Sequence, residues 1–399
     1  MKQTAFVGFL SLVLIIYCLI NYFLLRRGWQ AFKGWSYIQI IYLLFIITLS
    51  LSYPLIRLLP QSWRARCPTV FLVAGAFYLG FMFYLFLLLI LWDLLRLGGR
   101  WLRLPPFSPS SVLNIQGPGY RFSFLIILIL TVAIISIGYI NSLFPRLRSY
   151  EIRLAKSWSG SSPLKIAVVS DLHLGSVVRL SRLKKIVAKV NSLEPDLVLM
   201  AGDMLDEAVT LSQEEAAALI FINIKAKLGI IAVLGNHETY NRQEKRLEQL
   251  TKGYVRVLVD EVISLPGPVT VIGRRDRAAA SLGLARLKLE DLLQGVDHKF
   301  PIVLLDHQPV HLEEAEKAGV DLQVSGHTHA GQLFPLNWLN RKLYEKNWGY
   351  HRRGQTHYYI SCGVGTWGPP IQTAARPEIV LISLYSADGS GDMRQSLKN

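Results

Sequence analysis

The hydrophobic pattern divides this chain of 399 residues into two parts. The first part contains four uncharged runs, each long enough to cross about 30 Å of hydrocarbon at about 1.5 Å per residue: Ala5–Leu25, Trp35–Ile56, Thr69–Trp92 and Phe122–Ile140. A buried helix of a soluble protein would show a polar face with a period of about 3.6 residues, whereas these runs are apolar all round. The pattern therefore predicts an all-α membrane domain with four transmembrane helices over residues 1–142.

The second part alternates between short apolar runs and stretches with helical spacing. A linker is expected at residues 143–163, with Tyr150–Leu154 as a candidate short edge strand. Five runs that favour strands follow it: Leu164–Ser170, Leu197–Ala201, Ile230–Leu234, Ile302–Leu305 and Asp321–Val324. This alternation predicts a layered α/β domain over residues 164–385. The polar tail at residues 386–399 is expected to be disordered.

The distribution of charge supports the division. Residues 1–150 contain thirteen Lys and Arg but a single acidic residue, Asp93, whereas the remainder contains thirty basic and twenty-seven acidic residues. A nucleic-acid enzyme would carry its basic excess on the catalytic part, which here is near neutral. We therefore expect membrane lipids, and not nucleic acid, as partners of this chain. The three cysteines, Cys18, Cys67 and Cys362, form neither a disulfide framework nor a CxxC metal site.

The apolar runs have the character of an anchor. They contain no ionisable residue, whereas transporters and channels usually place such groups inside the bilayer. Counting the basic residues of the loops gives seven on the side away from the termini and four on the terminal side, which favours an extracytoplasmic second part. Four more basic residues directly after the last run bring the two sides close to a tie, so the orientation stays open.

Residues of metal-ligand type follow all five predicted strands: Asp171-x-His173, Gly202-Asp203-x-x-Asp206, Gly235-Asn236-His237-Glu238, Asp306-His307 and Gly326-His327-x-His329. Parallel strands end at one edge of a sheet, so a single site is expected there. Each motif alone has a simpler explanation as a turn or a helix cap. Together they supply oxygen and imidazole donors suited to Mn, Fe or Zn. Seven donors exceed the four of a tetrahedral zinc site, and two metals sharing one carboxylate fit the number.

In order and spacing, the five motifs resemble the signature of the calcineurin-like metallophosphoesterases. The segment Gly326–Gln332 is similar to one found in the membrane-associated bacterial branch of that family. The resemblance covers about Tyr150–Leu384 and does not include the four apolar runs. It implies a layered α/β metallophosphoesterase fold and a multi-pass protein of a bacterial cell membrane.

The resemblance also implies roles for individual residues. Seven would ligate two divalent metal ions, three for the first, three for the second and one bridging both: Asp171, His173 and His329; Asn236, His307 and His327; and Asp203. His237 would stabilise charge on the phosphoryl group or protonate the leaving oxygen. Asp206 and Glu238 would orient imidazole rings, with structural ion pairing as the alternative for both.

The function implied is metal-dependent hydrolysis of phosphoester or pyrophosphate bonds. Because an anchor raises the effective concentration of the enzyme at the bilayer, a lipid-linked envelope precursor is one candidate substrate. Two alternatives are a phosphodiesterase acting on nucleotides or nucleic acid and a non-catalytic metal-binding membrane protein. The presence of His237 and of every expected ligand favours an enzyme. The sequence indicates no protein partner.

Two features concern positive charge near the site. The segment Gly363–Gln372 resembles a family segment that often ends in Arg, where this chain has Gln. If that Arg holds a phosphate, this chain uses either another cation, for which the candidates are Arg352, Arg353 and Arg376, or a different substrate. A further basic run is predicted to be a solvated charged surface, with contact to a phosphate or a lipid headgroup as the alternative: Arg274, Arg275 and Arg277.

Overall fold

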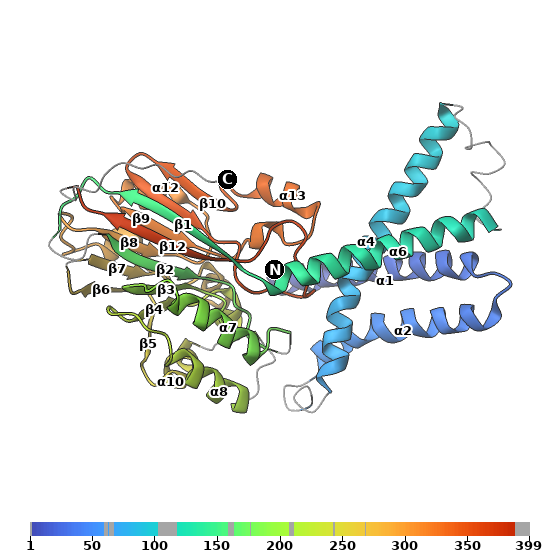
Figure 1. Cartoon of the computed structure of the whole chain (residues 1–399), viewed down its shortest axis with the longest axis horizontal. Coiled ribbons are helices and arrows are strands. Elements are labelled where there is room, and N and C mark those ends of the chain that lie inside the picture. The colour runs from blue at the N-terminus through green and yellow to red at the C-terminus, as the bar shows by residue number, and fades with distance from the viewer. Residues whose placement is uncertain are drawn as a thin grey trace. The chain divides into compact units, whose positions relative to one another are not determined.

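The computed structural model describes residues 2–59, 63, 68–102, 118–158, 163–175, 177–206, 211–241, 244–267 and 269–387. Residues 388–399, most of the tail expected to be disordered, lie outside the described residues. The chain divides into two compact units, Met1–Ile140 with Gly368–Ile371 and Asn141–Trp367 with Gln372–Asn399 (Figure 1).

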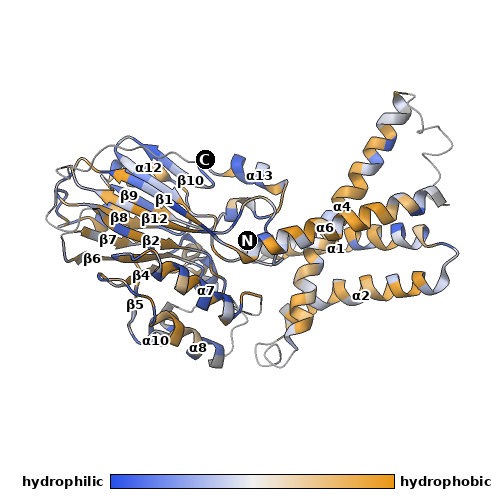
Figure 2. Cartoon of the chain, viewed as in Figure 1, coloured by the Kyte–Doolittle hydropathy of each residue, from blue (hydrophilic) through white to orange (hydrophobic). Residues whose placement is uncertain are grey.

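The first unit is built from long apolar helices. They are α1 (Lys2–Ala31), α2 (Ser36–Leu58), α4 (Thr69–Trp101) and α6 (Pro118–Leu143). Within the described residues, four helical stretches are long and apolar enough to cross a membrane: Leu10–Ala31, Ser36–Ile56, Thr69–Gly99 and Gly119–Leu143. Figure 2 shows these helices mostly in the orange of hydrophobic residues. The predicted set of four apolar helices is confirmed.

Polar side chains inside this unit bond to neighbouring helices or to their own helix. The Asn21 amide donates to the Tyr17 carbonyl oxygen at 2.8 Å, and its oxygen accepts from the Tyr78 hydroxyl. The Tyr42 hydroxyl donates to the Leu24 carbonyl oxygen at 2.9 Å. Such bonds satisfy groups that would otherwise be costly in hydrocarbon, as an anchor requires.

The second unit contains two six-stranded sheets in the described part of the chain. The first has the order β1 (Arg146–Arg153), β12 (Glu378–Tyr385), β2 (Leu164–Val169), β3 (Leu197–Ala201), β4 (Ile230–Val233) and β5 (Val255–Leu258). The second has the order β10 (Gly349–Arg353), β11 (Thr356–Ile360), β9 (Leu322–Ser325), β8 (Ile302–Leu305), β7 (Val269–Gly273) and β6 (Glu261–Leu265). Strands β2 to β5 run parallel to one another, as do β7, β8, β9 and β11.

The two sheets pack face to face and helices cover their outer faces (Figure 1). Ile166 and Val168 of β2 share a core with Val303 and Leu305 of β8. The alternate residue Ala167 belongs to a second core with α7 (Leu180–Asn191), α8 (Leu211–Phe221) and α10 (Glu244–Leu250). A third core joins the second sheet to α11 (Leu289–Leu292) and α12 (Leu312–Lys317). Because the inner strands β3, β4 and β8 are buried on both faces, their sequences are continuous apolar runs, and each buried Val, Leu or Ile contributes about 1.5–3 kcal/mol.

This arrangement confirms the predicted layered α/β domain, and the candidate edge strand at Tyr150–Leu154 forms part of the longer strand β1. Residues 143–163, expected as a linker, include the edge strand β1, which pairs in parallel with β12 from Arg146 opposite Glu378 to Arg153 opposite Tyr385. Of its eight residues only Ile152 is fully buried. An edge strand with one buried side chain gives little hydrophobic signal, and its partner lies more than two hundred residues away along the chain.

Candidate metal centre

The polar side chains that follow β2, β3, β4, β8 and β9 converge at the carboxyl edge of the two sheets. Three groups have ligand atoms within 4.8 Å of one another: Asp171, His173 and His329; His173, Asp203 and His237; and Asp203, His307 and His327. Asp203 belongs to two of them. The structure thus brings together the ligands expected from the sequence.

The first group holds two imidazoles and a carboxylate. His173 Nε2 lies 3.1 Å from His329 Nε2, and His329 Nε2 lies 3.5 Å from Asp171 Oδ1. On its other side, His173 Nε2 lies 3.8 Å from Asp203 Oδ2. The Nδ1 atoms of His173 and His329 are buried and have no hydrogen-bond partner among the described residues. Two facing ring nitrogens beside two carboxylates form a donor set that fits a shared cation.

The second group adds an amide oxygen. Asn236 Oδ1 lies 2.7 Å from His327 Nδ1 and 3.3 Å from His307 Nε2, and His307 Nε2 lies 3.2 Å from Asp203 Oδ2. His307 Nδ1 lies 2.6 Å from the carbonyl oxygen of Ala201. Because a carbonyl oxygen can only accept, Nδ1 carries a proton, and Nε2 is the ring atom that faces the cluster.

Buried hydrogen bonds fix the carboxylates. Both oxygens of Asp171 accept from the backbone N–H of His327, at 2.9 and 3.1 Å, and the Ser170 hydroxyl donates to Asp171 Oδ2. Asp203 Oδ1 accepts from the backbone N–H of His237 at 3.0 Å, which leaves Oδ2 facing the imidazoles. Each carboxylate therefore presents a defined oxygen to the cluster.

Glu238 is fully buried in α9 (Asn236–Tyr240), and its carboxylate accepts hydrogen bonds from backbone N–H groups. The resemblance implied that this residue orients an imidazole, with an ion pair as the alternative. The Glu238 carboxylate accepts from the backbone N–H groups of Asp203 at 3.1 Å and of Leu205 and Gly235 at 2.8 Å. These bonds tie the segment after β3 to the segment after β4. Asp206 is the acidic neighbour of an imidazole, with Oδ1 4.0 Å from His237 Nδ1.

The backbone of the site adopts conformations that L-residues avoid. The φ angles are positive at five ligand positions: Asp171 (52°), His173 (48°), Asp203 (53°), His327 (71°) and His329 (48°). Such conformations cost about 1–2 kcal/mol each and recur at functional sites, where other contacts impose them. Two glycines allow the loops to approach, because a Cβ at Gly235 would overlap the Asp203 carboxylate and one at Gly326 would overlap Ser170 and Asp171.

Burial and mutual charge shift the titration of the cluster. Burial raises the pKa of Asp171 and of Glu238, the latter to about 7 with help from the Asp203 charge. Burial also lowers the pKa of His327 to about 3, assisted by His307. Burial alone would raise the pKa of Asp203, but the nearby His307 and His173 outweigh burial and hold this pKa well below its usual range. For His307, burial acts to lower the pKa, but the Asp203 charge outweighs it and raises the pKa well above its usual value. A metal ion that binds Nε2 would displace the proton from that ring.

The sequence of this domain matches a known family. Residues 164–331 match the calcineurin-like phosphoesterases. The chain is 32% identical over 250 residues to an uncharacterized metallophosphoesterase of Aquifex aeolicus, and the match covers 62% of this chain and 94% of the relative. The chain belongs to the calcineurin-like phosphoesterase family. The resemblance drawn from the five motifs is confirmed, and with it the class of metal-dependent phosphoester hydrolases to which the family's name refers.

Relatives of this phosphoesterase include membrane proteins. This chain is 32% identical over 320 residues to a Danio rerio protein named transmembrane protein with metallophosphoesterase domain. The match covers 77% of this chain and 72% of the relative. The chain is 33% identical over 242 residues to an uncharacterized metallophosphoesterase of Helicobacter pylori, covering 60% of this chain and 64% of the relative's length. The four apolar helices and the transmembrane relative together indicate a membrane protein.

Two aromatic residues beside the metal centre of the phosphoesterase were not singled out from the sequence. The ring of Trp367 lies 5.9 Å from that of His237, centroid to centroid, and half of the residue is exposed. Its backbone N–H and C=O bond to the Gln332 side chain at 3.1 and 2.9 Å. The Tyr344 ring lies 6.4 Å from that of His327. Aromatic residues in loops carry no sequence signal that separates a site from a core.

The predicted solvated run of arginines is wrong. Arg274 is only 5% exposed, and its guanidinium lies 2.6 Å from Glu314 and 3.6 Å from Asp306. Arg286 also pairs with Asp306, at 2.5 Å. Asp306 directly precedes the candidate ligand His307, so the buried Arg274 and the partly buried Arg286 hold the end of β8 in place. The run resembles a charged surface in the sequence because its acidic partners, Asp260, Asp306 and Glu314, lie fifteen or more residues away.

The arginines proposed to replace a family Arg have other partners. Arg353 pairs with Glu316 at 2.9 Å and with Glu345 at 2.7 Å. Arg352 donates to the Gly354 carbonyl oxygen at 3.0 Å, and Arg376 donates to that of Phe144 at 2.8 Å. Within the described residues, no ion pair joins these three to a ligand of the cluster.

Proposed function

We propose that this chain is a membrane-anchored phosphoesterase that uses two divalent metal ions. The observation that carries the proposal is the position of Asp203, whose Oδ2 lies between the imidazoles of His307 and His173 at 3.2 and 3.8 Å. One carboxylate shared by two ligand groups is the geometry of a bridged pair of ions. Mn, Fe and Zn suit the mixed oxygen and nitrogen donors.

Seven residues would hold the metals: Asp171, His173 and His329 the first, Asn236, His307 and His327 the second, and Asp203 both. Two bound ions supply positive charge for the oxygens of a phosphoryl group and lower the pKa of a water so that hydroxide is available near neutral pH. The protein's contribution is to fix those seven donors before substrate arrives, through the backbone bonds to Asp171, Asp203 and Glu238.

His237 is the proposed acid. Its backbone is held by Asp203, and its ring lies between His173, at 4.7 Å between centroids, and Trp367. Asp206 Oδ1 lies 4.0 Å from Nδ1 of this ring. From this place the imidazole can donate a proton to the leaving oxygen or stabilise charge on the phosphoryl group.

The proposed substrate is a phosphoester or pyrophosphate of a lipid-linked molecule, such as an envelope precursor. Support comes from the presence of four apolar helices and a metal centre in one chain, because tethering confines the site to the bilayer surface. The proposed location is a bacterial cell membrane. Without the four basic residues that follow the last apolar run, the terminal side has four loop cations against seven, and this count favours an extracytoplasmic metal centre.

A metal-return experiment tests the proposal. The full-length protein is stripped of metal, supplied with Mn, Fe, Zn or Mg, and assayed on bis-p-nitrophenyl phosphate and on a monoester. We expect a transition metal to restore hydrolysis, Asp203→Asn to abolish it, and Asp291→Asn, at an exposed position of α11, to leave it unchanged. Two bound metals per chain without hydrolysis of either ester would instead support a non-catalytic metal-binding protein.

A further inference from the structure

Helix α13 (Leu336–Leu343), labelled in Figure 1, has its apolar side exposed. Leu336, Leu339 and Leu343 share one face because they recur at spacings of three and four residues. Their exposed fractions are 42%, 57% and 68%, whereas Asn337 is only 8% exposed. A helix on the surface of a soluble protein has the opposite arrangement, with its apolar stripe toward the core. The outer face of α13 is therefore built for an apolar neighbour.

The residues around this face have the composition of a membrane interface. Phe334 and Trp338 are 45% and 59% exposed, and their rings form an edge-to-face pair at 5.2 Å. Arg341 and Lys342 lie exposed in the last turn. Helices that lie in the headgroup layer combine Leu, Phe and Trp on one side with Lys and Arg beside them.

The polar side of α13 is bonded to the metal-ligand loop. The Asn340 amide donates to the Thr328 carbonyl oxygen at 3.5 Å. The Thr328 hydroxyl donates to the Asn347 carbonyl oxygen at 2.6 Å. Asn347 in turn donates to Asn340 Oδ1 at 2.9 Å. Thr328 stands between His327 and His329 in the chain, so the position of α13 is tied to the position of two candidate ligands.

We propose that α13, with Phe334, lies in the headgroup layer of the bilayer crossed by this chain's apolar helices. The three leucines would contact acyl chains, and Arg341 and Lys342 would contact anionic lipid phosphates. The spans keep a bilayer within reach of the second unit at all times. A second copy of the chain fits this face less well than lipid does. In a symmetric contact between two copies, Arg341 and Lys342 of one copy would lie near the same residues of the other. Where the proposed function holds, this docking presents the metal centre to phosphoesters of the headgroup layer.

Fluorescence quenching tests the docking without reference to activity. A cysteine at Leu339 carries an environment-sensitive label in full-length protein reconstituted into nanodiscs of phosphatidylcholine and phosphatidylglycerol, with Cys18 and Cys67 replaced by serine. Cys362 is buried and stays unlabelled. The matched control is a cysteine at Leu219, an exposed apolar position on α8 of the same unit. We expect nitroxide-bearing acyl chains to quench the label at 339 more strongly than that at 219, and aqueous iodide to show the reverse order.

Equal iodide quenching at the two positions would overturn the docking. Protection from both quenchers, with energy transfer between labelled copies, would also overturn it and assign the face to a second copy. A separate assay compares hydrolysis of a bilayer-embedded and a soluble phosphoester by the combined variant Leu336→Gln, Leu339→Gln and Leu343→Gln. The ratio of the two rates is expected to fall by about tenfold, as when positioning is lost, and to stay constant in Leu219→Gln. If the parent protein hydrolyses neither ester, the proposed function fails while the quenching result still decides the docking.

Discussion

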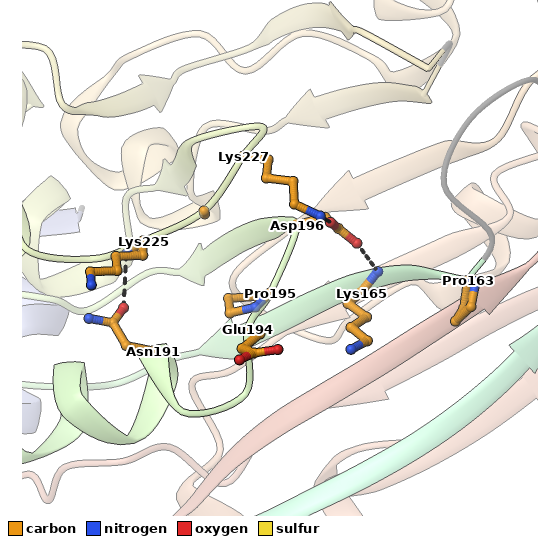
Figure 3. Close-up of a pocket in the computed structure, with 9 residues that line it drawn as sticks. Pro163, Lys165, Asn191, Glu194, Pro195, Asp196, Lys225 and Lys227 are labelled. Carbon is orange, nitrogen blue, oxygen red and sulfur yellow. Dashed lines mark hydrogen bonds and ion pairs between the residues drawn. The ribbon is translucent and has the colours of Figure 1, made fainter.

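The two edges of the first sheet both carry polar residues, but these residues are used differently. At the carboxyl edge, side chains from separate strands point their oxygen and nitrogen atoms at one another. At the amino edge lies a pocket of about 770 Å³ lined by lysines, prolines and acidic residues (Figure 3). There the Asp196 carboxylate accepts from the Lys227 ammonium at 2.8 Å and from the backbone N–H of Lys165 at 3.0 Å. The Asn191 side-chain oxygen accepts from the backbone N–H of Lys225 at 2.8 Å. Each of these groups is satisfied by a local bond.

This difference shows that convergence of donors, and not the volume of a cavity, marks the functional edge. Among the nine residues lining the amino-edge pocket, only Glu194 has a positive φ angle, whereas five of the seven candidate ligands do. Strained backbone persists where other contacts impose it. At the carboxyl edge those contacts are the buried bonds to Asp171, Asp203 and Glu238.

The largest contrast between the edges is expected in activity. His237→Ala should lower the rate of phosphoester hydrolysis by about 10²–10⁴-fold, because the ring that donates a proton is lost. Asn191→Ala, at the amino edge, should leave the rate unchanged. Steady-state kinetics with metal content measured in parallel checks this, since His237 is not a proposed ligand. Loss of a metal in His237→Ala would show that the ring ligates and would contradict its assignment as the acid.

The two glycines that flank β4 offer a closer comparison on one strand. At the carboxyl end, a Cβ at Gly235 would overlap Asp203, so Gly235→Ala should cost about 2 kcal/mol of unfolding free energy and weaken metal binding about tenfold or more. At the amino end, Gly229 has a φ of 85° and open space around it. Gly229→Ala should therefore cost about 1 kcal/mol through its backbone alone. Metal titration and denaturant unfolding of both variants provide the test, and equal metal affinities would remove the special role of Gly235.

An effect on stability alone is expected at the amino end of β11 in the second sheet. Burial, with a contribution from Arg352, lowers the pKa of His357 from 6.5 to about 4, and the neutral ring bonds to the Tyr350 hydroxyl at 2.8 Å. Since the unfolded chain binds a proton more tightly at this position, the folded protein loses stability as the pH falls from 6.5 to about 4. The expected loss is about 2 kcal/mol.

His357→Gln should remove this part of the pH dependence without affecting hydrolysis. The measurement is the free energy of unfolding of both proteins across that range, with metal present throughout so that the ligand imidazoles contribute equally. An unchanged pH slope in the variant would show that His357 does not titrate with unfolding.

The sequence predicted the candidate ligands of the site more completely than the residues that surround them and hold them in place. The residue types after five strands indicated both the edge and the donors, because strands buried on both faces end abruptly in polar residues. The same pattern could not place Trp367 beside His237 or Arg274 beside Asp306. Those contacts join segments separated by tens of residues or more, and each residue type has several common roles.

Local properties of the sequence determined the four apolar helices, the buried parallel strands and the set of candidate ligands, since hydropathy, period and side-chain chemistry are carried by neighbouring residues. Tertiary structure alone decided that β1 belongs to the first sheet, that Glu238 holds three backbone N–H groups, and that the leucines of α13 face outward. The spacing of Leu336, Leu339 and Leu343 specifies an apolar stripe equally well for either orientation of the helix. Only its packing, with Asn337 buried and Asn340 bonded to Thr328, determines which side remains exposed.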